Sequence, residues 1–291
     1  MPHWKAILAY DGTPYNGWQI QPNLPTIQGT LAQAIQHVSG ETILPQGSGR
    51  TDTGVHALAQ VATFSLNVPI PAANLHRALN RALPPSIRVL SVEVVPEAFH
   101  ARHSAHRKTY EYRIFPRVPY PSTLPPVIER ICPPTLAPFV WDCPLPLDFA
   151  ILQNAADHIR GTHDFTSFAA VDPDLATRTA EAKATDDPEE DTVLKGQDFS
   201  IKPSPNTRTI FHSSWHRHDG LLIYQVSGNG FLHHMVRNLV GTFVAAAARR
   251  ISADDIPNIL AALDRSAAAA TAPARGLFLV EVEYPKAEVE H

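Results

Sequence analysis

The segment at residues 49–57, GRTDTGVHA, has the residue types that chemistry on a polar substrate requires. It places one carboxylate, Asp52, two residues after Arg50 and between Gly49 and Gly54. Arg50 is the nearest cation along the chain and would keep the carboxylate ionised. The glycines permit unusual backbone angles and let a ligand approach the backbone closely. An ordinary tight turn with a hydrogen-bonded aspartate fits the same residues, so the segment alone leaves both interpretations open.

The chain lacks the signatures of the common nucleotide-dependent and hydrolytic enzymes. It has no Gly-x-x-x-x-Gly-Lys-Ser/Thr loop, no Gly-x-Gly-x-x-Gly motif after a strand and no Gly-x-Ser-x-Gly turn. Nucleotide hydrolysis, hydride transfer and serine hydrolysis therefore lack their expected parts. What remains is a loop carboxylate with nearby arginines and a tyrosine on a basic strand. Such a set suits cofactor-free chemistry on a phosphate-bearing substrate.

Fifteen histidines raise the alternative of a metal-dependent hydrolase. His212, His216 and His218 lie on one predicted hairpin, and His233 and His234 open a predicted helix. Neither group has an i, i+4 helical pair with a following carboxylate, and neither has cysteine ligands close by. We therefore expect no metal site.

Cellular location is indicated by the N-terminus and by cysteine usage. No apolar run approaches the length that crosses a bilayer, and the N-terminus leads directly into a strand pattern without a cleavable signal. Cys132 and Cys143 have no C-x-x-C spacing, and we expect both to be free thiols. These features predict a cytoplasmic protein without membrane association.

Charge is distributed unevenly along the chain, whose formal net charge is −4. Residues 172–198 hold nine acids and three bases, leaving 19 acids and 21 bases elsewhere. Residues 100–117 are rich in basic side chains, namely His100, Arg102, His103, His106, Arg107, Lys108, Arg113 and Arg117. A basic stripe in a neutral protein is typical of phosphate contacts, although basic residues also protect exposed strand edges from pairing.

Hydrophobic periodicity predicts an α+β protein with helices packed on a sheet. Strands are expected at residues 4–10, 58–64, 87–95, 107–115, 209–215, 221–226 and 277–282. Helices are expected at residues 26–38, 74–83, 147–159, 231–249 and 252–263, the last with a capping box of Ser252 and Asp255. A proline-rich connector at 116–146 and a mobile acidic surface insertion at about 172–205 complete the predicted organisation.

Residues 49–57 resemble the active-site loop of the tRNA pseudouridine synthase A family. The resemblance continues in the same order along nearly the whole chain, through separate blocks at residues 10–19, 99–105, 108–112, 164–168, 231–241 and 276–279. The block at 231–238 reads FLHHMVRN, and that at 99–102 reads FHAR. Seven matches in order are far more specific than a single Gly-Arg-Thr-Asp motif.

The resemblance implies an isomerase that converts uridine to pseudouridine in the anticodon stem-loop of tRNA, without a cofactor or metal. Asp52 matches the catalytic aspartate, acting either as the nucleophile at C1′ or as the base at C2′. Tyr110 matches the tyrosine that packs on the target base. Arg237 matches the arginine that pairs with the aspartate. Because a stacked base must be extruded before reaction, Arg50 would brace the vacated position.

The same resemblance implies substrate contacts by other groups and a homodimeric assembly. His233 and His234 are expected to contact phosphate or to pack in the core. The chain departs from the family in its acidic insertion and in Lys108, where a more arginine-rich form is usual. The insertion is either an inert loop or a gate that repels misplaced RNA. The change at Lys108 would reduce phosphate affinity but leaves Tyr110 intact.

The resulting prediction is two similar domains of mixed, mainly antiparallel sheet with helices on one face, divided at 1–105 and 106–291, with Asp52 in the cleft between them. A non-catalytic tRNA-binding protein of the same fold is the alternative function. Intact Asp52, Arg50, Tyr110 and Arg237 argue against this alternative.

Overall fold

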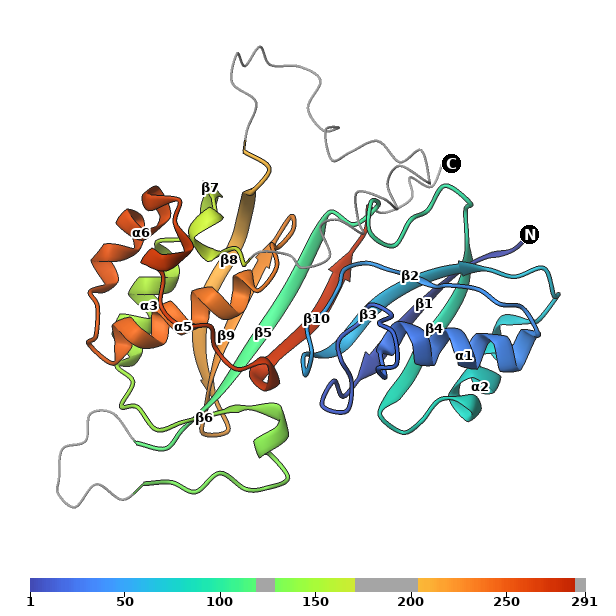
Figure 1. Cartoon of the computed structure of the whole chain (residues 1–291), viewed down its shortest axis with the longest axis horizontal. Coiled ribbons are helices and arrows are strands. Elements are labelled where there is room, and N and C mark those ends of the chain that lie inside the picture. The colour runs from blue at the N-terminus through green and yellow to red at the C-terminus, as the bar shows by residue number, and fades with distance from the viewer. Residues whose placement is uncertain (119–128, 171–203, 286–291) are drawn as a thin grey trace, which may run out of the picture.

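One mixed, mainly antiparallel sheet forms the centre of the protein, and the computed structural model describes residues 1–118, 129–170 and 204–285 (Figure 1). The strands are β1 (His3–Tyr10), β2 (Gln46–Gly47), β3 (His56–Ser65), β4 (Ile87–Val95), β5 (Arg107–Pro116), β6 (Trp141–Cys143), β7 (Gly161–Asp164), β8 (Thr207–His218), β9 (Leu221–Gly228) and β10 (Leu277–Glu283). The helices are α1 (Ile27–Ser39), α2 (Ala72–Ala82), α3 (Phe149–Asp157), α5 (Met235–Ala247) and α6 (Ile256–Ala262).

The strand order is β4-β1-β3-β10-β5-β9-β8-β7, with β2 paired to β3 and β6 paired to β5 beside this path. The C-terminal strand β10 therefore lies between β3 and β5. It runs antiparallel to β5 along most of its length but pairs in parallel with β3 only at Phe278 and Leu279. This single strand joins the sheet of the first hundred residues to that of the rest of the chain.

Helices accompany both halves of the sheet, which confirms the predicted α+β class. In Figure 1, α1 and α2 lie beside the half built from β1, β3 and β4, whereas α3, α5 and α6 lie beside the other half. The division at 1–105 and 106–291 stays a prediction. The sheet itself is continuous across it.

Alternation of buried and half-buried side chains accounts for the strands that the sequence predicts. In β1, Trp4, Ala6, Leu8 and Tyr10 are buried and alternate with half-buried neighbours, as the period of two in a strand requires. The predicted strands at 4–10, 58–64, 87–95, 107–115 and 277–282 are each present, extended by a few residues at most. The short strands β2, β6 and β7 were not predicted, because two to four residues are too few to show a period.

The predicted start of the helix at 231–249 is wrong. α5 begins at Met235, because His234 has a left-handed backbone (φ 59°, ψ 2°) that cannot continue a right-handed helix. Within α5, Leu239, Val240 and Phe243 are fully buried, so this helix forms the core of its half.

Several smaller predictions have clear outcomes. Ser252 and Asp255 form the predicted capping box, but the turn they cap is a short 3₁₀ segment, and α6 begins only at Ile256. Cys132 and Cys143 are free, as expected. The acidic insertion lies outside the described residues except for its last two positions, 204 and 205. None of the helices in the described ranges is long and apolar enough to cross a membrane.

The turn after β1 packs tightly against the turn before β3. The backbone amide of Gly12 donates a hydrogen bond to Nδ1 of buried His56 (3.1 Å). A Cβ atom at Gly12 would overlap the backbone carbonyl of Val55. Gly12 and Val55 lie within two residues of β1 and β3, and both are held by backbone hydrogen bonds in their turns. Because the overlap is with backbone, it cannot be relieved by a side-chain rotation.

We predict that Gly12→Ala lowers the free energy of unfolding by about 3 kcal/mol, at the upper end of overpacking costs. Gly40→Ala is the matched control, since Gly40 has φ 76° but no atom within 4 Å of an added Cβ. It should cost only the backbone strain, about 1 kcal/mol. Urea unfolding measures both values, and equal losses would show that the Gly12 contact is not rigid.

Candidate active site

The loop that carries Asp52 is held by its backbone and by its neighbour Thr51. The Thr51 hydroxyl hydrogen-bonds the buried Tyr10 hydroxyl (2.8 Å), and the Thr51 carbonyl accepts from the amide of Trp18 (2.9 Å). The Asp52 carbonyl accepts from the amide of Val55 (3.1 Å), closing a turn that includes Gly54 at φ 76°. These contacts leave the Asp52 side chain 18% exposed and pointing away from the turn.

The start of the same loop is tied to β3 and to β5. The Ser48 hydroxyl donates to Oε1 of buried Gln60 (2.6 Å), and the Gln60 amide nitrogen donates to the Gly49 carbonyl (2.9 Å). Lys108 on β5 donates from Nζ to the Ser48 carbonyl (2.7 Å). The loop is therefore attached to both of the strands that flank β10.

Arg237, in the first turn of α5, makes an ion pair with Asp52. Its Nη1 lies 2.9 Å from Oδ2 of Asp52, and the two side chains are 15% and 18% exposed. The Nε of the same guanidinium donates to the Ala272 carbonyl (2.8 Å). One edge of the guanidinium is thus fixed by backbone, while another edge orients the carboxylate.

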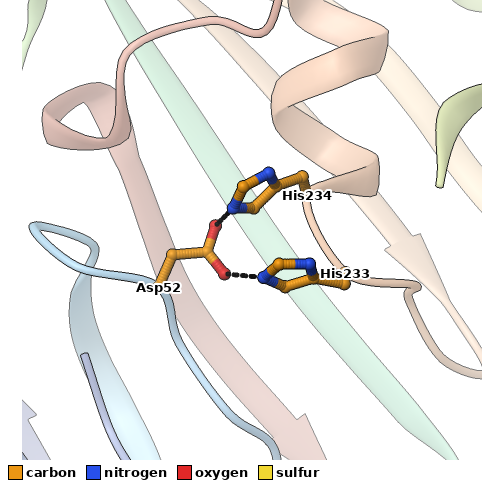
Figure 2. A group of neighbouring side chains, drawn as sticks. All are labelled: Asp52, His233 and His234. Carbon is orange, nitrogen blue, oxygen red and sulfur yellow. Dashed lines mark ion pairs between the residues drawn. The ribbon is translucent and has the colours of Figure 1, made fainter. Parts of the chain in front are cut away.

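His233 and His234 face the same carboxylate, and Figure 2 shows both imidazoles pointing at Asp52. The Nε2 atoms lie 3.6 Å from Oδ1 (His233) and 3.4 Å from Oδ2 (His234). The two rings stack with centroids 3.9 Å apart at an interplanar angle of 29°. Burial lowers the pKa of His234, with the positive charges of Arg237 and Arg265 acting in the same direction and Asp52 opposing them. His234 is therefore neutral at pH 7.

A metal ion is the alternative occupant of this group. Asp52, His233 and His234 bring ligand atoms within 4.8 Å of one another, and within the described ranges no other set of histidine, cysteine or acidic residues does so. Two features oppose a metal. The guanidinium of Arg237 already binds the carboxylate, and the two imidazoles stack on each other with centroids 3.9 Å apart, which leaves little room for an ion between their planes. The absence of a metal stays a prediction supported by this geometry.

Tyr110 on β5 is almost completely buried and lies near enough to Asp52 for the carboxylate to influence the pKa of its phenol. Its ring packs edge-to-face on Phe231, with centroids 5.0 Å apart. Burial raises the pKa of Tyr110 well above its usual value, and the Tyr10 phenol (once ionised) and the Asp52 carboxylate act in the same direction. The phenol consequently stays protonated at neutral pH, where it can donate a hydrogen bond but cannot act as a base.

The structure thus brings together Asp52, Arg237, His233, His234 and Tyr110. The sixth predicted site residue, Arg50, lies half-buried on the loop itself.

Part of the predicted basic stripe has acidic partners within the protein. Arg107 lies 3.6 Å from Glu283, Arg113 lies 3.1 Å from Glu111, and Arg117 lies 2.6 Å from Asp142. These pairs reduce the positive charge that the stripe can offer to phosphate.

Two contributors to the site were not identified from the sequence. Tyr10 braces Thr51, and the Ala272 carbonyl holds Arg237. The inward position of Tyr10 at the end of an alternating strand could have indicated the first. No local signal marks the second, because any residue type supplies a backbone carbonyl.

A cavity of about 350 Å³ lies on the far end of the Asp52 turn, lined by Gly54 together with Thr13, Ala137, Pro138 and Arg275.

Comparison with known proteins agrees with this arrangement. The chain matches a family model described as tRNA pseudouridine synthase over residues 6–104 and 195–285. It is 45% identical over 280 residues to the tRNA pseudouridine synthase A of Solibacter usitatus, which covers 96% of this chain and 98% of that protein. It is 39% identical over 287 residues to the protein of that name from Moorella thermoacetica, covering 98% and 100% of the two chains. The matched ranges include the Asp52 loop and the whole of α5, whereas β5 lies between them. The chain therefore belongs to the tRNA pseudouridine synthase family.

Proposed function

We propose that this protein isomerises uridine to pseudouridine in the anticodon stem-loop of tRNA, with Asp52 as the catalytic group. The observation that carries the proposal is the carboxylate of Asp52, which is held by Arg237 and faced by His233 and His234. It lies near enough to Tyr110 to raise the pKa of that phenol. The family membership of the chain supports the same reaction.

The reaction requires no external reductant, oxidant or phosphoryl donor. The bond from C1′ to N1 of the uracil breaks, the uracil turns, and a bond from C5 to C1′ forms. C5 then loses its proton while N1 gains one, so atoms and electrons balance within the nucleoside. An ionised carboxylate serves either as the nucleophile at C1′ or as the base at C2′, and its ion pair with Arg237 supplies the required orientation.

The other site residues have roles that follow from their positions. Tyr110 presents a buried, protonated phenol beside the carboxylate, which suits packing against the target uracil and donating a hydrogen bond to it. His233 and His234 form a flat stacked surface next to Asp52 and contact the substrate from that side. Arg50 braces the position that the extruded nucleotide leaves.

A non-catalytic tRNA-binding protein of the same fold is the competing proposal. Burying a carboxylate and a guanidinium together costs free energy. A loop that only binds RNA gains nothing from a buried carboxylate that would offset this cost. The retained ion pair therefore favours an enzyme. We further propose that the protein works in the cytoplasm as a homodimer, so that an elongated tRNA contacts both subunits.

Asp52→Asn should lower the rate of pseudouridine formation by at least about 10³-fold, as loss of a catalytic carboxylate does in other enzymes. Affinity for tRNA should change little, because phosphate contacts dominate it. Tritium release from 5-tritiated uridine in an unmodified tRNA transcript measures the rate, and a gel shift measures binding. Asp157→Asn is the matched control, since Asp157 also pairs with an arginine, Arg160, at 2.9 Å but is 48% exposed. A normal rate for Asp52→Asn would refute the mechanism.

Tyr110→Phe should retain tRNA binding but lower the single-turnover rate by up to about tenfold, the value of one neutral hydrogen bond. The ring and its packing on Phe231 are conserved in this variant, so the folded structure should be unaffected. Rapid-quench measurement with saturating enzyme isolates the chemical step. An unchanged rate would restrict Tyr110 to a packing role.

Removal of metal should leave activity unchanged. Protein dialysed against EDTA and assayed in metal-free buffer is expected to release tritium at the untreated rate, within about twofold, since Arg237 already neutralises the carboxylate. Elemental analysis of the purified protein serves as the control. Loss of activity that zinc restores would instead support a metal site at Asp52, His233 and His234.

A further inference from the structure

A short irregular segment, residues 268–272, lies along one side of α5 and is held by that helix. Asn238 and Thr242, one helical turn apart, are fully buried and both contact it. The Thr271 hydroxyl donates to Oδ1 of Asn238 (2.7 Å), and the amide of Ala269 donates to the Thr242 hydroxyl (3.2 Å). The approach is close enough that a Cβ atom at Gly241 would overlap the Ala270 carbonyl.

Arg265 also fastens the same segment. Its Nη1 donates to the carbonyls of Ala268 (3.2 Å) and Ala269 (3.1 Å). Its Nη2 donates to the Thr271 hydroxyl (3.0 Å) and to Oδ1 of Asn238 (3.1 Å). A single half-buried guanidinium therefore contacts the segment at three points and α5 at a fourth. Lysine could not reproduce this, because its ammonium lacks the planar fork of donors.

The segment ends at the residue that holds the ion-paired arginine. Ala272 accepts a hydrogen bond from Nε of Arg237 (2.8 Å), and its amide donates to the Arg237 carbonyl (3.1 Å). The opposite end of that guanidinium contacts Asp52. The position of the Ala272 carbonyl consequently determines the angle at which the guanidinium meets the carboxylate.

We propose that Arg265, acting with Asn238, is a positioning residue for the reaction: it fixes residues 268–272 and, through the Ala272 carbonyl, the orientation of Arg237 on Asp52. Arg265 contacts neither Asp52 nor a substrate atom in this account. The inference rests on the proposed function for its kinetic consequence. Its structural consequence, the ordering of the Arg237 side chain, is independent of that function.

A double-mutant cycle tests whether Arg265 acts through Arg237. Arg265→Ala should lower the single-turnover rate at saturating enzyme by about 10- to 100-fold, because small misplacements of a catalytic pair have effects of that size. The KM for tRNA should change less than about twofold. In an Arg237→Ala background, removal of Arg265 should then have almost no further effect. Independent, multiplicative losses, or a loss confined to KM, would overturn the proposal.

Arg160→Ala is the matched control for general destabilisation. Arg160 likewise donates to a backbone carbonyl, that of Ser213 (3.2 and 2.9 Å), and it also pairs with Asp157. Neither of these partners contacts Arg237 or residues 268–272 in the described part of the chain. It should lower the melting temperature without changing the single-turnover rate. If Arg265→Ala does not fold, Thr271→Val removes one of its contacts with less disturbance, and Arg265→Lys should remain slow although the charge is kept.

The ordering of Arg237 can be measured without any activity. The Nε proton of Arg237 is assigned in ¹⁵N-labelled protein by its loss in Arg237→Lys. In the free protein it should be resolved and slow to exchange in the wild type and in Arg160→Ala, but fast to exchange in Arg265→Ala. Slow exchange in Arg265→Ala would overturn the inference. A wild type that shows the ordered resonance but forms no pseudouridine would instead refute the proposed function alone.

Discussion

The ion pair between Asp52 and Arg237 is the interaction on which the rest of this site depends. Its partners are 185 residues apart, and both are largely removed from water. Burying either charge alone costs several kcal/mol, and their attraction offsets that cost only when the geometry is good. Both sides must therefore be held rigidly. Thr51 and Tyr10 provide this for the carboxylate, and the Ala272 carbonyl provides it for the guanidinium.

The sheet sets the distance across which these groups meet. Adjacent strands lie about 4.8 Å apart, so the insertion of β10 between β3 and β5 separates the base of the Asp52 loop from the strand of Tyr110 by about 10 Å. The loop spans that gap, with Lys108 of β5 bound to its Ser48 carbonyl. The last strand of the chain thus completes a site whose catalytic loop lies in the first fifth of the sequence.

Local pattern was sufficient for most strands and helices and for the residue types of the site. Alternation located β1 and β5, and the motif at 49–57 identified Asp52 once its resemblance to a family was added. The sequence pattern did not reveal local backbone irregularities or contacts between residues that are distant in the chain. Nothing in the spacing of FLHHMVRN indicates that His234 adopts a left-handed backbone, because apolar residues at Leu232, Val236 and Leu239 continue the helical period through it. The start of α5 was therefore placed too early.

The parallel pairing of β10 with β3, and the dependence of Arg237 on the Ala272 carbonyl, were equally hidden from the sequence. Both involve backbone atoms, which carry no residue-specific signal. Resemblance to a family supplied the pairing of Arg237 with Asp52, but the contacts that orient the pair became visible only in the folded structure.

The charge states around Asp52 suit a neutral base better than a phosphate. Arg237 balances the carboxylate, burial keeps His234 uncharged, and Tyr110 remains protonated. The carboxylate, Arg237, His234 and Tyr110 together therefore carry almost no net charge. Uracil is itself uncharged, so it can enter without an unpaired buried charge, whereas a phosphate would bring at least one negative charge next to Asp52. The polyanionic backbone of an RNA must accordingly be bound at a distance from the carboxylate, while the base alone approaches it.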